Sequence, residues 1–156
     1  MQPASYQDLV HRLRALAPFS DESSTERALV ATVDALRGQL TPEERQLFAC
    51  ELPEELAQIL RRPEPFAQGR PGEVFERVAA REHVRLGLAI EHAEVVCRAL
   101  GETASPTLRA RLIHAAPELG RLFALLREPP PTSGPSLDAA PRDAHGDRKL
   151  SSARGR

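Results

Sequence analysis

The side chains best suited to metal binding or proton transfer in this sequence are its five histidines. They are His11, His83, His92, His114 and His145. Asp8 and His11 are three residues apart, so a helix would place a carboxylate and an imidazole on one face. Metal sites in helical bundles combine two such motifs with two further carboxylates, and only one motif is present. We therefore expect an exposed pair at Asp8 and His11 and no bound metal.

Two of the other histidines have neighbours that suggest a role. Glu91, His92 and Glu94 cluster in one predicted helix, but no second histidine lies four residues from His92 to complete a ligand pair. We expect this cluster to form a solvated helix face. His114 lies between two apolar residues and is a candidate for burial, which would shift its pKa and could make it a pH sensor.

The sequence contains none of the common motifs of nucleophilic catalysis. The chain has no Gly-x-Ser-x-Gly turn, no glycine-rich phosphate loop and no Cys-x-x-Cys pair. We expect neither an enzyme nor a cofactor. Cys50 and Cys97 fall within helical patterns beside apolar residues, which favours two buried thiols over a disulfide.

Clustered basic residues suggest an alternative function. Arg77, Arg81 and Arg85 are four residues apart and would form a ridge on one helix face, with Glu73 placed to pair with Arg77. The C-terminal residues 148–156 are also basic. A net charge of −1 argues against a strong phosphate-attracting field, so nucleic-acid binding through the ridge and the tail is the second hypothesis.

Helices must position all of these side chains, because apolar residues recur at helical spacing along the chain. Ser5 can cap the first helix, and Ser23 with Glu26 has the spacing of a capping box for the second. The segment Thr41-Pro42-Glu43-Glu44 combines a capping threonine, a proline at the first position and a glutamate at the third. A fourth helix is expected to begin near Pro53. The fold class is therefore all-α.

A register of 64 residues relates the two halves of this pattern. It aligns Thr41-Pro42 with Ser105-Pro106 and Pro53-Glu54 with Pro117-Glu118. The apolar stripe of the second helix aligns with small or apolar residues; the matched sets are Leu29, Val33, Leu36, Leu40 and Ala93, Cys97, Leu100, Ala104. We predict two tandem repeats of roughly four helices, residues 5–60 and 72–127, joined by a Pro-rich connector at 61–71.

The remaining segments differ in composition. Residues 128–156 are rich in Pro, Ser, Gly, Asp and Arg and have too few apolar side chains to offset the entropy of ordering, so we expect a disordered tail. The N-terminus has neither a basic nor an apolar leader, and no apolar run is long enough to span a membrane. These features indicate a cytoplasmic protein.

The repeated pattern of capping and apolar residues resembles that of a bacterial family catalogued as domain of unknown function 2267. The residues that carry the resemblance run from Ala35-Leu36 to Leu52-Pro53-Glu54, and again from Ala99-Leu100 to Ala116-Pro117-Glu118. The second copy departs from the pattern by having Ala116 in place of leucine. The resemblance implies a two-repeat, all-helical domain and brings no catalytic residue with it.

Surplus apolar residues in the last predicted helix suggest the leading hypothesis for function. Leu119, Leu122, Phe123 and Leu126 could offer an apolar surface to another protein or to a second copy of the chain. We therefore predict a non-catalytic interaction or adaptor module. Nucleic-acid binding is the alternative, and a small enzyme or metal protein is a third hypothesis.

Overall fold

The computed structural model describes residues 4–17, 19–63 and 73–115. Within these ranges the chain forms α-helices and no β-strand, which confirms the all-α prediction. The helices are α1 (Tyr6–Leu16), α2 (Glu22–Arg37), α3 (Pro42–Glu51), α4 (Glu54–Arg61), α5 (Glu73–Glu82), α6 (Leu86–Thr103) and α7 (Pro106–Ala115).

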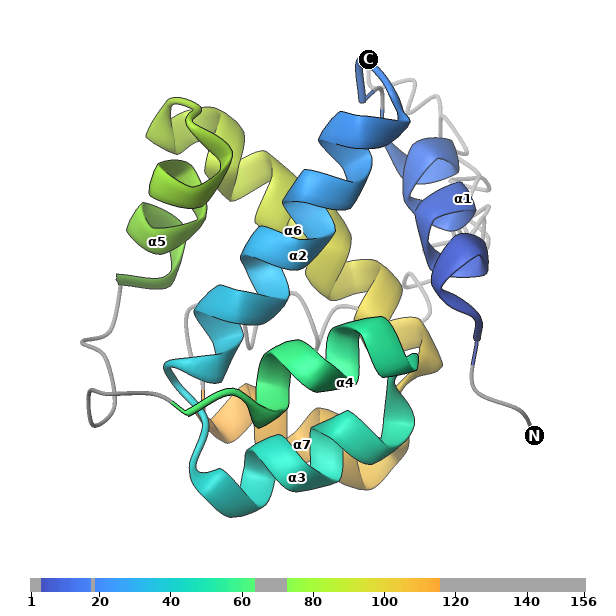
Figure 1. Cartoon of the computed structure of the whole chain (residues 1–156), viewed down its shortest axis with the longest axis vertical. Helices are drawn as coiled ribbons and strands as arrows, with labels where there is room; N and C mark the ends of the chain where they lie inside the picture. Colours follow the sequence, from blue (N-terminus) through green and yellow to red (C-terminus); the bar gives the residue numbers. More distant parts are fainter. Residues whose placement is uncertain (1–3, 18, 64–72, 116–156) are drawn as a thin grey trace, which may run out of the picture.

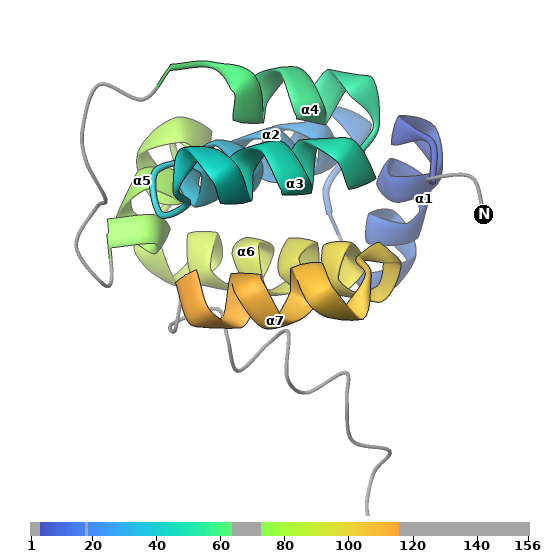
Figure 2. The same ribbon diagram turned by 90° about the horizontal axis from the view of Figure 1, so that it is seen from below.

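The two longest helices, α2 and α6, cross at the centre of the molecule (Figure 1). Helices α1 and α5 lie on opposite sides of this crossing, and each contacts both α2 and α6. Helices α3, α4 and α7 gather at one end, where α3 contacts both α4 and α7. Figure 2 looks onto that end.

The core consists mainly of leucine, valine and alanine. The predicted stripe of α2 and its continuation, Leu29 to Leu40, is buried, and so is the aligned set from Ala93 to Ala104 in and after α6. Small residues on α6 let its backbone approach α2 closely. Phe48 of α3 is the largest fully buried side chain of the described core.

Local capping explains where most helices begin. Thr41 with Glu44 forms a complete capping box, as predicted, and Ser5, the predicted cap of α1, forms a second box with Asp8. The predicted cap of α2 is wrong: Asp21, not Ser23, caps the helix by accepting a hydrogen bond from the Ser24 N–H at 2.6 Å. Because α2 begins two residues earlier than expected, Ser23 and Glu26 lie inside it.

Two predictions of burial are wrong for the same geometric reason. Cys50 of α3 is exposed, because it follows buried Phe48 by two residues, which is more than half a turn. His114 of α7 is also exposed and follows buried Leu112 by the same interval. Cys97 is buried as predicted, and neither cysteine forms a disulfide. Burial raises the pKa of the Cys97 thiol far above its ordinary value.

Thiol labelling tests this difference between the cysteines. We expect a maleimide to modify one thiol, Cys50, in the native protein and both thiols in denaturant, because only exposed thiolates react readily. Mass spectrometry of the native and unfolded protein gives the two stoichiometries. Equal labelling rates for Cys50 and Cys97 under native conditions would contradict the packing of α6.

Several predictions fall on residues outside the described ranges. They concern most of the connector at 61–71, the end of the second predicted repeat, the tail at 128–156, and the side chains Leu119, Leu122, Phe123 and Leu126. Among the described helices, none combines the length and apolar composition required to cross a bilayer.

Candidate functional site

A buried carboxylate and an imidazole form the most unusual polar contact of the described chain. Glu82, the last residue of α5, is only 3% exposed, and the side chain of His92 on α6 is 15% exposed. The Nδ1 atom of His92 lies 2.9 Å from Oε1 and 3.2 Å from Oε2 of Glu82. With the carboxylate ionised, Nδ1 donates to it, and Nε2 remains available for another partner. We call these two residues the Glu82–His92 pair.

Helix periodicity places Glu82 on the buried face of α5. It follows the buried residues Val74 and Val78 at intervals of four, so it continues an apolar stripe with a charged group. The helix then ends at His83, whose φ of 58° lies in the left-handed region. The N–H of Val84 donates to the carbonyl of Ala79 at 3.1 Å and closes this turn. The turn brings α6 back against α5, so that His92 meets Glu82.

An aromatic contact joins the pair to the segment between α1 and α2. The rings of Phe19 and His92 have centroids 4.8 Å apart and planes inclined by 45°. Such tilted packing is favourable for aromatic rings. The imidazole is therefore positioned from two directions, by Glu82 on α5 and by Phe19 before α2.

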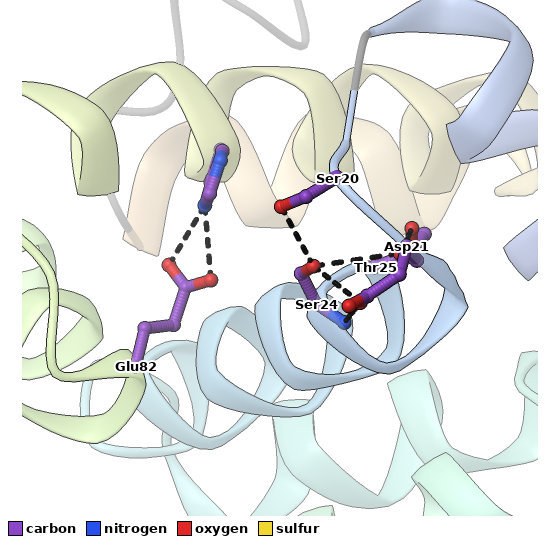
Figure 3. Close-up of polar contacts among 6 residues, drawn as sticks. Ser20, Asp21, Ser24, Thr25 and Glu82 are labelled. Atoms are coloured by element: carbon purple, nitrogen blue, oxygen red, sulfur yellow. Dashed lines mark hydrogen bonds and ion pairs between the residues drawn. The ribbon is translucent and has the colours of Figure 1, made fainter.

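A second polar group lies beside the pair at the start of α2 (Figure 3). The Ser24 hydroxyl donates to Oδ1 of Asp21 at 2.6 Å and lies 3.2 Å from the Ser20 hydroxyl. The Thr25 hydroxyl donates to the Asp21 carbonyl at 2.9 Å. Hydrogen bonds from the Ser24 side chain and backbone lower the pKa of Asp21. Oδ1 of this carboxylate is therefore engaged in capping α2.

These two polar groups line one cavity of about 350 Å³. Its apolar lining comes from Phe19, Val84 and Leu88, and Arg27 adds a cation. Arg27 is exposed and forms no ion pair with a described residue. A cavity of this volume with a mixed apolar and polar lining is typical of a site that binds a small ligand or a partner's side chains.

The cavity also borders the open end of α6. Arg85 precedes this helix without a side-chain cap, and the first turn contains no acidic residue. A Cβ added to Gly87 would meet no atom within 4 Å, so internal packing gives no reason for glycine there. The first N–H groups of α6 carry partial positive charge. This end of the helix therefore favours an acidic group.

The polar contacts at the cavity do not join a serine hydroxyl to the imidazole among the described residues. In the described part of the chain, the serine hydroxyls at the cavity bond to Asp21 and to each other, and none is hydrogen-bonded to His92. Nucleophilic catalysis requires a nucleophile in contact with its base. No three histidine, cysteine, aspartate or glutamate side chains among these residues gather as metal ligands.

The three arginines of the predicted ridge lie on two elements, with Arg77 and Arg81 on α5 and Arg85 just before α6. Arg77 pairs with Glu73 at 3.5 Å, as predicted, but Arg81 reaches across to Asp34 of α2 at 3.0 Å. Arg85 lies beyond the end of α5, at the cap of α6, so it does not continue the face of the other two. Ion pairing therefore offsets the charge of Arg77 and Arg81, and the ridge itself stays a prediction.

The other predicted histidine sites have mixed outcomes. Asp8 and His11 are both exposed, as expected. The pKa of Asp8 is lowered mainly by hydrogen bonds from Ser5. The expected solvated face is confirmed for Glu91 and Glu94, which are exposed, and is wrong for His92, whose side chain is 15% exposed. Sequence reasoning did not identify Glu82 as the partner of His92. The available signal for a buried carboxylate was the position of Glu82, which continues the spacing of Val74 and Val78.

Comparison with known proteins places the chain in a family without an assigned activity. No curated protein and no solved structure matches it. The family model described as "Uncharacterized conserved protein (DUF2267)" matches residues 6–122, in agreement with the resemblance drawn from the repeated motifs. The chain belongs to this DUF2267 family of uncharacterised conserved proteins.

Proposed function

We propose that this protein is a non-catalytic interaction module and that its partner docks at the cavity beside the Glu82–His92 pair. The observation that carries the proposal is the exposure of Leu86 and Leu88 at the start of α6, by 47% and 43%. Leu88 also lines the cavity. Large apolar side chains grouped at the rim of a cavity are characteristic of protein-binding surfaces.

Charge indicates the chemistry of the partner. Both carboxylates of the cavity have hydrogen-bond partners, Asp21 in the cap of α2 and Glu82 in its pair with His92. Arg27 lies near enough to Asp21 to help lower its pKa but forms no ion pair with a described residue, and the N-terminal end of α6 has no side-chain cap. We infer that the partner is an apolar segment of another protein that carries acidic residues.

The scaffold proposed for this module is a duplicated helical unit. In the 64-residue register α1 corresponds to α5 and α2 to α6. Helix α1 contacts both α2 and α6, and α5 also contacts both, so the contacts of one half have equivalents in the other. The central contact of α2 with α6 and the contact of α3 with α7 are likewise self-matching. Such an arrangement supports repeats at residues 5–60 and 72–127. It also supports different roles for the two halves, because Glu82 and His92 align with no comparable pair.

A matched pair of leucine variants tests the binding surface. Leu88→Asp places a charge at the cavity rim, while Leu47→Asp places one on α3, where Leu47 is 41% exposed and does not line the cavity. We expect Leu88→Asp to weaken the partner's binding at least tenfold, since about 1.4 kcal/mol corresponds to that factor. Leu47→Asp should leave the affinity unchanged.

Measurement proceeds in two steps. Proteins captured from native lysate by the wild type and by Leu47→Asp, but not by Leu88→Asp, are identified by mass spectrometry and then titrated in purified form. Light scattering of the protein alone runs in parallel. If light scattering shows a dimer that dissociates only in Leu88→Asp, the partner is a second copy of the chain and not an acidic segment of another protein. Equal capture by all three proteins would refute the surface.

A further inference from the structure

A second cavity lies at the helix pair α3 and α4 and shares no lining residue with the cavity at the Glu82–His92 pair. It has a volume of about 220 Å³ and lies between the first turns of α3 and the C-terminal end of α4. Its lining includes three arginines, Arg45, Arg61 and Arg62, together with Gln46. We call it the arginine pocket. Its lining contains no described acidic residue.

Only one of these arginines has a described acidic partner. Arg61 pairs with Glu54 at 2.8 Å along α4. Arg45 and Arg62 form no ion pair with any described residue. Among the described residues, two guanidinium groups of the arginine pocket therefore have no carboxylate partner.

Helix electrostatics accounts for two of the arginines and leaves the third with one buried donor unsatisfied. Arg61 and Arg62 lie at the C-terminal end of α4, where the helix dipole favours cations. Arg45 comes from α3, near the end of that helix where cations are disfavoured. One of its terminal nitrogens donates to the Arg62 carbonyl at 3.4 Å, but its Nε is buried without an acceptor. Such a buried donor calls for an acceptor.

We propose that the arginine pocket binds the phosphate group of a small phosphate monoester. Arginine presents several N–H donors in a planar fork that matches phosphate oxygens. A phosphate monoester carries about −1.5 to −2 charge at neutral pH, which balances two guanidinium groups, whereas a carboxylate balances one. A cavity of about 220 Å³ has room for the phosphate and a short organic group.

Nucleic acid is a poorer match for the same residues. A duplex or single strand requires a track of cations along the backbone. Arg77 and Arg81, the other candidate arginines for such a track, are paired with Glu73 and Asp34. A compact pocket with two guanidinium groups that have no described carboxylate partner suits one phosphate group instead.

Calorimetric titration of the full-length protein at low salt tests the proposal. The probes are inorganic phosphate, O-phosphoserine, acetate and a single-stranded oligonucleotide. We expect saturable binding of the first two, weakened about tenfold or more in Arg62→Gln and in Arg45→Gln through loss of charged hydrogen bonds. Arg98→Gln is the matched control, because Arg98 is exposed on α6 and lies outside the pocket.

Each outcome decides for or against the arginine pocket. Loss of phosphate binding in Arg62→Gln, with the control unchanged, supports it. Circular dichroism verifies folding, and if Arg45→Gln does not fold, exposed Arg62 decides alone. No saturable phosphate binding, equal affinity for acetate, or equal weakening in Arg98→Gln would overturn it. Tighter binding of the oligonucleotide that depends on Arg62 would overturn it in favour of nucleic acid.

Discussion

Replacing His92 by leucine is expected to lower the free energy of unfolding by about 3 kcal/mol, because it leaves the buried Glu82 carboxylate without a partner. Leucine roughly preserves the apolar volume against Phe19, so the loss reports the polar contact and not a large cavity. Urea denaturation followed by circular dichroism measures the change. His11→Ala is the control, since His11 is exposed on α1 and should change stability by no more than about 0.5 kcal/mol.

The double variant Glu82→Leu with His92→Leu separates pairing from packing. Removing both partners removes the unpaired charge, so we expect stability to return to within about 1 kcal/mol of the wild type. If the double variant is instead as unstable as the sum of the single variants, the two side chains are not coupled. That result would contradict the 2.9 Å contact from which the candidate site is built.

Local signals explain why much of the fold could be predicted from the sequence. The capping box of Thr41 and Glu44 depends on residues three apart, and the buried stripe of α2 depends on helical periodicity. Both are present in a short window of sequence. The position of the α2 cap was harder, because Asp21 and Ser23 are both good capping residues and lie two positions apart.

The candidate site could not be predicted because it depends on contacts between distant elements. Glu82 and His92 are ten residues apart and meet only because His83 adopts a left-handed conformation and reverses the chain. Phe19 reaches His92 from a segment more than seventy residues away. Periodicity identifies which face of a helix is buried, but it does not identify which element covers that face.

The start of α7 also depends on a contact between distant elements that the sequence does not reveal. In α3, Glu44 at the third position completes the capping box of Thr41. The aligned position in α7 is Leu108, which is buried and cannot return a hydrogen bond. Glu51, at the end of α3, takes that role from outside the helix. It accepts from the Ser105 N–H at 2.7 Å and from the Ser105 hydroxyl at 2.6 Å.

Glu51→Ala is therefore expected to lower the free energy of unfolding by about 2 kcal/mol, because Ser105 loses two hydrogen bonds to a charged acceptor. Glu51→Gln should cost less, since an amide oxygen can still accept one of them. Glu91→Ala is the control, because Glu91 is exposed on α6 and has no described partner. Urea denaturation gives all three values, and a loss in Glu51→Ala no larger than in Glu91→Ala would refute the cap. Ser105 itself caps α7 by accepting from the Leu108 N–H at 3.2 Å, so a loss confined to Glu51 would mean that the second half of the chain depends on the first to hold this cap in place.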